Sequence, residues 1–99
     1  MARLGLSAGA EADLDRLYEF LAATDPVGAD ALAALVLDGL SILERFPLVG
    51  RPAEHGKHEL VISRGHSGYV ALYEYVPEED VVLVLAIRHQ REAGYSEER

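Results

Sequence analysis

Residues 69–87, YVALYEYVPEEDVVLVLAI, decide the fold of this 99-residue chain. Tyr69–Val76 carries aromatic or apolar side chains at every second position, a period that is typical of a β-strand with one buried face. Residues 77–80 (PEED) form a turn, and Val81–Ile87 is continuously apolar, as expected of a central strand covered on both faces. The stretch therefore predicts an antiparallel hairpin.

A third strand is predicted upstream of this hairpin. His58–Ile62 has the composition of a strand, and residues 65–68 (GHSG) supply the turn that leads into Tyr69. A loop is predicted before it from Phe46-Pro47, Gly50, Pro52 and Gly56. Residues 58–87 are thus expected to form an antiparallel meander.

Two helices are predicted before this loop. The first follows a short extended segment at residues 2–6, takes Ser7 as its N-cap and runs to about residue 23. The second begins at Asp25-Pro26, an N-cap followed by a proline at the first helical position, and runs to about Arg45. The first carries a single apolar stripe, formed by Ala10, Leu14, Leu17, Tyr18 and Leu21.

The second helix is apolar on two sides. A helix of this kind needs two neighbours, so we expect an antiparallel helical hairpin packed on the sheet, with most of the apolar surface in the core. One stripe consists of Ala29, Leu32, Ala33, Val36, Leu40 and Leu43, and the other of Leu35, Ile42 and Phe46.

The order of these elements defines the fold class. It is α+β, with the order β-α-α-β-β-β and a helical hairpin packed on a small, mostly antiparallel sheet. Residues 1–96 are expected to form a single domain and residues 97–99 a polar C-terminal tail, because a chain of this length has room for one core.

Composition restricts the function. The chain has no cysteine, which excludes disulfides, thiolate metal sites and a cysteine nucleophile. The apolar run Val81–Ile87 is too short to span a bilayer and the N-terminus has no signal-peptide pattern, so we expect a soluble, cytoplasmic protein with no membrane partner. A net charge of −8 opposes freestanding nucleic-acid binding, because such proteins hold phosphates with Lys and Arg.

Basic side chains are predicted to gather at one end of the sheet. The first and third strands of the meander run the same way, so their C-terminal ends lie at one edge. The acidic turn at residues 78–80 lies at the opposite end, which polarises the chain. The target-binding candidates at the basic edge are Arg64, His66, Arg88, His89 and Arg91.

Three interpretations of this edge remain open. Exposed strand ends often carry Arg and His without a specific role. Alternatively, the arginines recognise an acidic or phosphate-bearing surface through bidentate contacts. In the third interpretation Arg64 and Arg88 stabilise a pentavalent phosphate while His89 or Tyr95 transfers protons, functions that suffice for RNA cleavage through its own 2′-hydroxyl without a metal.

Other candidate sites are weaker. His55 and His58 belong to a loop that runs into a strand, so a surface loop is favoured over a metal site, and we expect neither a metal nor a cofactor. Gly65 and Gly68 are not followed by the helix that a phosphate-binding loop requires. No serine–histidine–acid arrangement is predicted.

Several segments, in order along nearly the whole chain, are similar to those of a known family. They are residues 6–14 (LSAGAEADL), Phe46-Pro47 with residues 50–52 (GRP), residues 59–62 (ELVI), 67–73 (SGYVALY) and 87–95 (IRHQREAGY), the last being the most telling. Together they resemble toxins of the RelE/ParE superfamily, which belong to type II toxin–antitoxin modules. The resemblance implies the same β-α-α-β-β-β fold that the periodicity predicts.

The resemblance also implies a cognate antitoxin, ParD-like or similar. Its C-terminal segment would wrap the toxin along the helical hairpin and the sheet, and DNA would be contacted only through the antitoxin complex. The second stripe of the second helix supplies the antitoxin-binding candidates, Leu35, Ile42 and Phe46, although most of this stripe is expected to be core.

The superfamily divides by target. RelE-like members cut mRNA on the ribosome with several Lys and Arg residues and a Tyr or His near the C-terminus, to which Arg64, Arg88, His89 and Tyr95 would correspond. ParE-like members poison DNA gyrase and need no catalytic set. A single lysine and a pI near 4.8 favour the ParE-like branch, so we expect a plasmid-stabilising gyrase inhibitor that is not an enzyme. A ribosome-dependent mRNA endonuclease and an inactive relative that only binds its antitoxin are the alternatives.

Overall fold

The computed structural model describes residues 1–64, 67–92, 94 and 95, with the backbone alone at residues 63, 64 and 67. The predicted β-α-α-β-β-β order is confirmed, with one short strand and two 3₁₀ turns in addition. The elements are β1 (Arg3–Leu6), α1 (Ala8–Ala22), α2 (Pro26–Leu40), η1 (Ser41–Glu44), β2 (Arg51–Pro52), η2 (Glu54–Gly56), β3 (His58–Arg64), β4 (Ser67–Val76) and β5 (Val81–His89).

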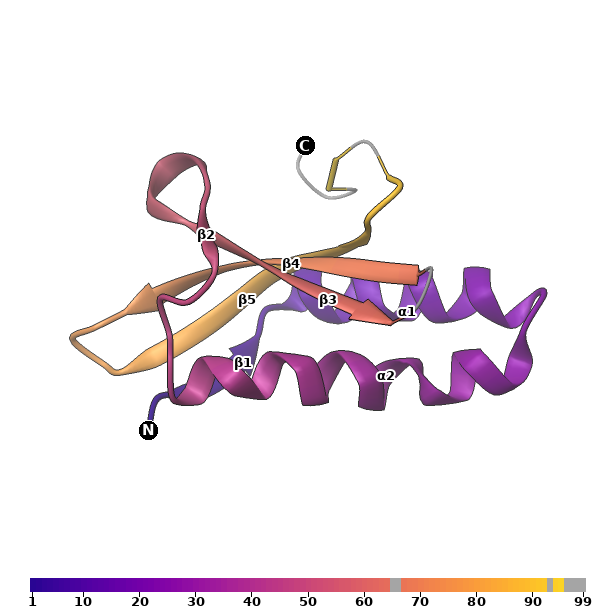
Figure 1. Cartoon of the computed structure of the whole chain (residues 1–99), viewed down its shortest axis with the longest axis horizontal. Helices are drawn as coiled ribbons and strands as arrows, with labels where there is room; N and C mark the ends of the chain where they lie inside the picture. The colour runs from indigo at the N-terminus through magenta and orange to yellow at the C-terminus, as the bar shows by residue number, and fades with distance from the viewer. Residues whose placement is uncertain (65–66, 93, 96–99) are drawn as a thin grey trace.

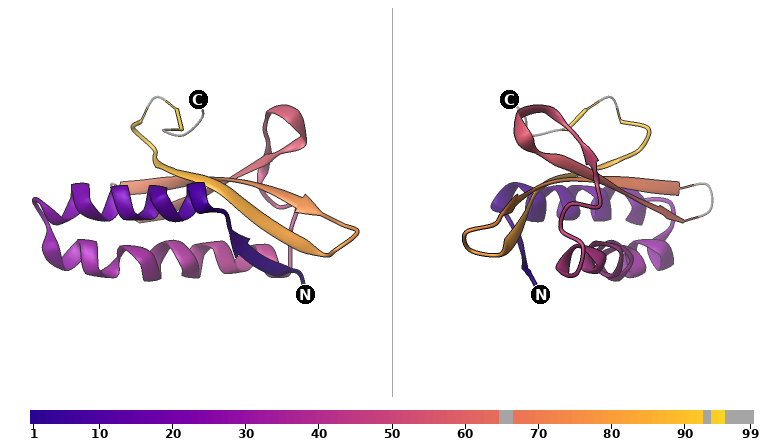
Figure 2. Two further views of the ribbon diagram at one scale, coloured as in Figure 1. Left: turned by 180° about the vertical axis from the view of Figure 1, so that it is seen from behind. Right: turned by 60° about the vertical axis from the view of Figure 1, so that its left-hand side comes forward.

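The strands form one mixed sheet with the order β1-β5-β4-β3-β2, in which β1 is parallel to β5 and the other pairs are antiparallel. Both helices pack on one face of the sheet (Figure 1), and the C-terminal segment and the loop around β2 lie over the other face (Figure 2). The core fills the space between helices and sheet; its largest fully buried side chains include Tyr73, Leu40, Leu43, Ile87 and Val36.

Both predicted helix starts are confirmed. Ser7 Oγ accepts a hydrogen bond from the N–H of Ala10 at 3.1 Å, and Asp25 Oδ1 accepts one from the N–H of Gly28 at 3.0 Å. Each cap satisfies an amide that has no partner within its own helix.

The prediction of a regular second helix to about Arg45 is wrong in the last turn. α2 ends at Leu40 and the chain continues as the 3₁₀ turn η1. A 3₁₀ turn places three residues per turn in place of 3.6, which changes the direction of the side chains that follow. Leu43 is fully buried there, whereas Ile42 is 43% exposed.

Two members of the predicted helical stripes lie outside the core. Ala33 is exposed, and Tyr18 is 41% exposed and donates its hydroxyl hydrogen to Asp30 Oδ1 at 3.2 Å. That bond links α1 to α2 at the surface. The other members of the α1 stripe and of the first α2 stripe are buried or half-buried.

By length and composition alone, Pro26–Glu44 is apolar enough to cross a membrane, with a mean hydropathy of 1.6. In the fold, its inward-facing residues pack against the other helix and the sheet instead. The hydropathy of this stretch follows from its two apolar sides.

β5 is fully covered on one face only, which corrects the prediction of a strand buried on both. Val82 and Val84 have no exposed surface, whereas the residues between and beside them, Val81, Leu83 and Leu85, are half-buried. The helices cover the first face, and among the described residues the C-terminal segment and the loop around β2 lie over the second face. An antiparallel pairing next to β5 permits this one-sided burial.

Side chains of α1 complete the edge of β5 beyond β1, which is only four residues long. Ser7 Oγ donates to the carbonyl of Leu85 at 3.1 Å, and Asp13 Oδ2 accepts from the N–H of Ile87 at 2.9 Å. Arg16 Nη2 donates to the carbonyl of Ile87 at 3.4 Å. The helix therefore holds the C-terminal half of β5 by hydrogen bonds along the edge beyond β1, opposite the edge that pairs with β4.

The opposite edge differs from the prediction in two ways. The two-residue strand β2 was not predicted and pairs Arg51 with Glu59. β3 extends to Arg64, which pairs with Ser67, so the predicted turn at residues 65–68 is shorter than expected. Residues 65–66 lie outside the described residues.

Candidate functional site

β3 and β5 end on the same side of the sheet, as the meander topology predicts. Ile62, Tyr69 and His89 lie in register across β3, β4 and β5. The acidic turn at residues 77–80 joins β4 to β5 at the other end. Of the target-binding candidates, Arg64 is described by its backbone alone and His66 lies outside the described residues.

Arg88 and His89 point to opposite faces of the sheet, because successive side chains of a strand alternate. The Arg88 guanidinium lies 5.1 Å from the ring centroid of Tyr95. The His89 ring meets Tyr69 edge-on, with the centroids 5.3 Å apart, and Tyr69 belongs to the core on the helix side. Of the residues considered for catalysis, the structure brings Arg88 and Tyr95 together and separates His89 from them.

Glu59 joins Arg51 and Tyr95 on the face opposite the helices. Arg51 Nε donates to Glu59 Oε1 at 3.0 Å, and the Tyr95 hydroxyl donates to Oε2 at 2.6 Å. With Arg88 against the Tyr95 ring, these four residues form what we call the outer cluster. Glu59 is its centre, because it contacts residues from the loop and from the C-terminal segment.

Within the outer cluster, the Glu59 carboxyl is held deprotonated and the Tyr95 hydroxyl is held protonated. The hydrogen bond from Tyr95 is the main cause that lowers the pKa of Glu59, and Arg51 lowers it further, against a smaller opposing effect of burial. Burial is the main cause that raises the pKa of Tyr95, and the hydrogen bond to the Glu59 carboxylate raises it further. The phenol is therefore a hydrogen-bond donor at neutral pH and a poor general base.

Arg88 also binds the main chain that follows β5. Its Nη1 donates to the carbonyls of His89, Gln90 and Glu92 at 3.2, 3.3 and 3.1 Å. This guanidinium nitrogen turns the chain after β5 back over the sheet. Arg88 is thus a positioning residue for the C-terminal segment.

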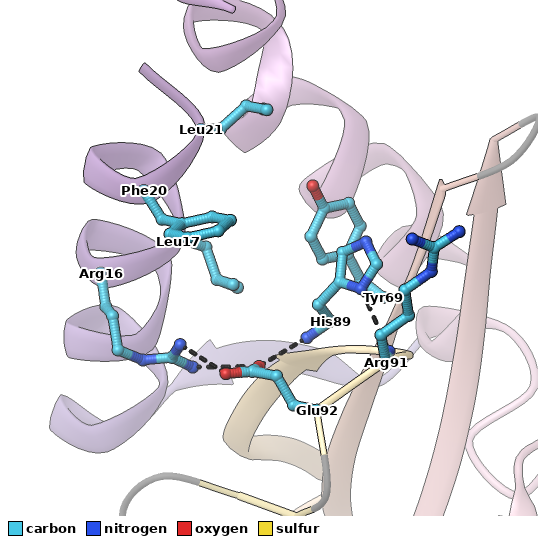
Figure 3. A pocket seen from close by; sticks show the side chains of 8 residues that line it. All are labelled: Arg16, Leu17, Phe20, Leu21, Tyr69, His89, Arg91 and Glu92. Atoms are coloured by element: carbon cyan, nitrogen blue, oxygen red, sulfur yellow. Dashed lines mark hydrogen bonds and ion pairs between the residues drawn. The ribbon is translucent and has the colours of Figure 1, made fainter. Parts of the chain in front are cut away.

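On the helix side, a pocket of about 680 Å³ opens between α1 and the ends of β4 and β5 (Figure 3). We call it the α1–β5 pocket. One wall is apolar and comes from α1; the other carries Tyr69, His89 and Arg91. Its lining consists of Arg16, Leu17, Phe20, Leu21, Tyr69, His89, Arg91 and Glu92.

Glu92 fixes the polar end of this pocket. Its Oε1 accepts from the N–H of His89 at 2.8 Å and its Oε2 accepts from Arg16 Nη1 at 2.8 Å. His89 Nδ1 in turn accepts from the N–H of Arg91 at 3.1 Å. In the part of the chain that the structure describes, the Arg91 guanidinium and the Tyr69 hydroxyl have no hydrogen-bond partner.

The three antitoxin-binding candidates on α2 and after it differ in exposure. Leu35 is half-buried and packs against the core, but Ile42 is 43% and Phe46 57% exposed. The prediction that most of this stripe is core is therefore wrong for its C-terminal part, because η1 breaks the helical period there. Leu48 and Val49 extend the exposed apolar surface, at 60% and 52% exposed.

The histidines considered for a metal site are separated. The His58 ring stacks on Tyr73 with the centroids 5.6 Å apart, and His55 lies in the 3₁₀ turn η2 with a positive φ of 61°. Among the described residues, no three His, Asp or Glu side chains are grouped in a way that could hold a metal ion.

Sequence reasoning missed Glu59, Glu92, Asp13 and Arg16. Each is an ordinary charged residue on a strand, turn or helix, and its role depends on a partner 36 or more positions away. A buried Asp on the inner side of α1 is the one feature with a signal in the sequence, because position 13 lies between the apolar positions 10, 14 and 17.

Residues 4–94 match the protein family described as "ParE toxin of type II toxin-antitoxin system, parDE". A curated relative, Toxin RelE3 from Caulobacter vibrioides, is 33% identical over 92 residues, which cover 93% of this chain and 98% of the relative.

Two solved structures have the same fold. The chromosomal ParDE system from P. aeruginosa matches with a TM-score of 0.75 and 23% identity, over 88% of this chain and 94% of that chain. The toxin–antitoxin complex RelBE2 from Mycobacterium tuberculosis matches with a TM-score of 0.61 and 24% identity, over 92% of this chain and 93% of that chain.

Proposed function

Because the chain belongs to the ParE toxin family of type II toxin–antitoxin systems, we propose that it arrests growth by binding and inhibiting DNA gyrase, and that a cognate antitoxin neutralises it. It would act in the cytoplasm as a protein ligand of its target. It would not act as a nuclease.

We favour gyrase binding over RNA cleavage because Arg88 and His89 are separated. An RNA-cleaving site needs a phosphate-binding cation and proton-transferring groups within reach of one scissile bond. Arg88 and His89 lie on opposite faces, and Arg88 Nη1 is occupied by three main-chain carbonyls. Because its pKa is raised, Tyr95 stays protonated at neutral pH and is not available as a general base. A net charge of −8 adds repulsion from RNA.

The antitoxin partner is supported by three observations. Both similar solved structures are described as toxin–antitoxin systems or complexes. The exposed apolar residues Ile42, Phe46, Leu48 and Val49 form a surface that a protein partner would cover. In addition, only His58 and Glu59 of β3 pair with β2, so the rest of that strand edge has no strand partner within the described residues.

A ribosome-dependent mRNA endonuclease is the second candidate. The curated relative carries the name Toxin RelE3, and the outer cluster groups two arginines with a tyrosine on an open face of the sheet. In that case Tyr95 would have to lose its bond to Glu59 before it could act on RNA.

The deciding experiment compares gyrase supercoiling with cell-free translation, using the same preparation of the full chain. We expect inhibition of supercoiling and no change in translation. Tyr95→Phe, which removes only the hydroxyl, should leave gyrase inhibition unchanged. Arrested translation that Tyr95→Phe relieves would overturn the proposal in favour of the nuclease. Growth without arrest when the chain is expressed alone would identify an inactive relative.

A further inference from the structure

The α1–β5 pocket combines an apolar wall with an unpaired cation. Leu17 and Leu21 of α1 belong to its apolar wall, and Phe20, which is 80% exposed, stands at its rim. Across from them lies the guanidinium of Arg91, with no ion pair to any described residue. Such a pocket suits a ligand that is apolar and carries one negative charge.

The charges around the pocket favour an anionic group at one position only. Arg16 is neutralised by Glu92, at 2.8 Å, and by Asp13, at 3.7 Å. Arg91 remains as the cation that a ligand can reach, on the wall that also carries Tyr69 and His89. A carboxylate at this position would accept hydrogen bonds from Arg91.

The exposure of Phe20 indicates a polypeptide and not a small molecule. A small ligand within the pocket would leave most of this ring in water, whereas a protein segment that continues across the rim would cover it. Large aromatic side chains are typical anchors of protein interfaces. The hydrogen bonds of Glu92 hold the polar wall in place before binding, which lowers the entropic cost of association.

The pocket lies apart from the surface suggested for the antitoxin. It opens at the C-terminal half of α1, beside the hairpin that leads into α2, whereas Ile42 and Phe46 lie at the C-terminal end of α2 and beyond (Figures 1 and 3). It includes His89 and Arg91 from the basic edge of the sheet. A protein segment can therefore bind the pocket without contacting Ile42 or Phe46.

We propose that the α1–β5 pocket anchors the protein target of the toxin, and that it takes a segment of that target in which a large apolar side chain lies next to a carboxylate. This inference rests on the proposed function in so far as it takes the target to be a protein. It adds where the target binds and which chemistry is recognised.

The direct test titrates the ¹⁵N-labelled full chain with the peptide acetyl-Asp-Phe-Leu-Asp-amide and, as a neutral match, with acetyl-Asn-Phe-Leu-Asn-amide. The acidic peptide should shift the amide signals of Leu17, His89 and Glu92 to saturation. The neutral peptide should bind about tenfold more weakly, the loss expected for one hydrogen-bonded charge. Shifts elsewhere on the chain, equal binding of both peptides or no saturable binding would each overturn the proposal.

Two exposed substitutions and two matched controls then locate the effect. Arg91→Gln and Phe20→Ala should each weaken the acidic peptide about tenfold or more, because they remove the cation and the rim. Arg45→Gln and Val27→Ala change the same residue classes outside the pocket, Val27 being 81% exposed, and should leave binding unchanged. If the controls weaken binding as much as the pocket variants, the proposal is overturned.

Gyrase supercoiling measured with the same four variants separates this inference from the proposed function. If the wild-type chain inhibits gyrase, Phe20→Ala and Arg91→Gln should raise the half-inhibitory concentration about tenfold, and unchanged inhibition overturns the inference while leaving the function intact. If the wild-type chain does not inhibit gyrase, the proposed target fails and the peptide titration alone decides the inference.

Discussion

Asp13 is a carboxylate that the fold buries, with 3% of its surface exposed. Its Oδ2 accepts from the N–H of Ile87 and its Oδ1 lies 3.7 Å from Arg16 Nη2. Buried charges are stable when they are hydrogen-bonded and paired, and both conditions hold for this carboxylate. Asp13 therefore connects α1 to β5 and indirectly shapes the α1–β5 pocket.

We expect Asp13→Ala to lower the free energy of unfolding by about 3 kcal/mol, because it leaves the N–H of Ile87 buried without an acceptor. Asp13→Asn keeps an acceptor oxygen and should lose about 1 kcal/mol. Asp15→Ala, at an exposed position of the same helix, is the control and should change little. Urea denaturation followed by circular dichroism measures all three. Equal stability of Asp13→Ala and Asp15→Ala would contradict the assigned role.

The bond between Tyr95 and Glu59 makes stability depend on pH. The folded-state pKa of Glu59 lies below its ordinary value of 4.5, so the stabilisation is complete above that value and is lost as the pH falls through the folded pKa. We expect the urea midpoint of the wild-type chain to fall on acidification more steeply than that of Glu59→Gln. Tyr95→Phe should move the pKa of Glu59 back towards 4.5, measured by carboxyl ¹³C NMR. An unchanged titration in that variant would contradict the hydrogen bond.

Single residues were the hardest features to predict from the sequence. The basic strand ends followed from topology, because strand direction is set by the order of turns. The separation of Arg88 from His89 follows from strand alternation, once both are known to lie within β5. The pairing of Glu59 with Tyr95 spans 36 positions and has no local pattern.

Ser7 serves two elements at once. It caps α1 through the N–H of Ala10 and also donates to the carbonyl of Leu85, whereas the side chain of Asp25, the cap of α2, bonds to Gly28 alone among the described residues. The register of β4 on β5 shifts next to Leu85, since Leu72 pairs with Ala86 and Tyr73 with Val84. Ser7 therefore supports a bulge as well as a helix start.

We expect Ser7→Ala to destabilise the chain by about 2 kcal/mol and Asp25→Ala by about 1 kcal/mol, because only the first also removes a bond to the sheet. Hydrogen exchange should be faster at the residues around Leu85 in Ser7→Ala than in Asp25→Ala. Equal losses of stability with unchanged exchange in β5 would contradict the double role.

At the scale of elements, patterns with a period were predicted well and departures from a period were not. Both helix starts are marked by N-cap residues, and the β3–β4–β5 meander is marked by turn residues and by alternating apolar side chains. The bulge, the strand β2 and the 3₁₀ turn after Leu40 depend on tertiary fit; no residue type marks them in the sequence. The missed turn is the one that bears on the proposed antitoxin surface, because it leaves Ile42 43% exposed.

The whole molecule has two different ends. Its principal extents are 42 × 28 × 23 Å, so surfaces at the two ends of the helical hairpin are well separated. One end carries the α1–β5 pocket and the basic strand termini. The other carries the acidic turn at residues 77–80, and the apolar residues around Phe46 follow the C-terminal end of α2. Under the proposed function, the antitoxin and the target would bind at different ends of the molecule.

This separation predicts that antitoxin binding can be weakened without changing the pocket. Phe46 is 57% exposed, so Phe46→Asp should leave the free energy of unfolding nearly unchanged. It places a charge where we expect an apolar contact, and should weaken antitoxin binding about 30-fold, the equivalent of about 2 kcal/mol. Val27→Asp introduces the same charge at a residue that is 81% exposed near the start of α2, and should bind the antitoxin as the wild type does.

Calorimetric titration of the antitoxin into the three proteins measures this difference. The rise in Tm on adding antitoxin gives a second measurement, because a ligand that binds only the folded chain raises Tm more when it binds more tightly. Phe46→Asp should show a smaller rise than Val27→Asp while both bind the acidic peptide at the α1–β5 pocket as the wild type does. If Phe46→Asp keeps full affinity, the antitoxin lies elsewhere. If Phe46→Asp also loses the peptide, the two surfaces are coupled and the two ends do not act independently.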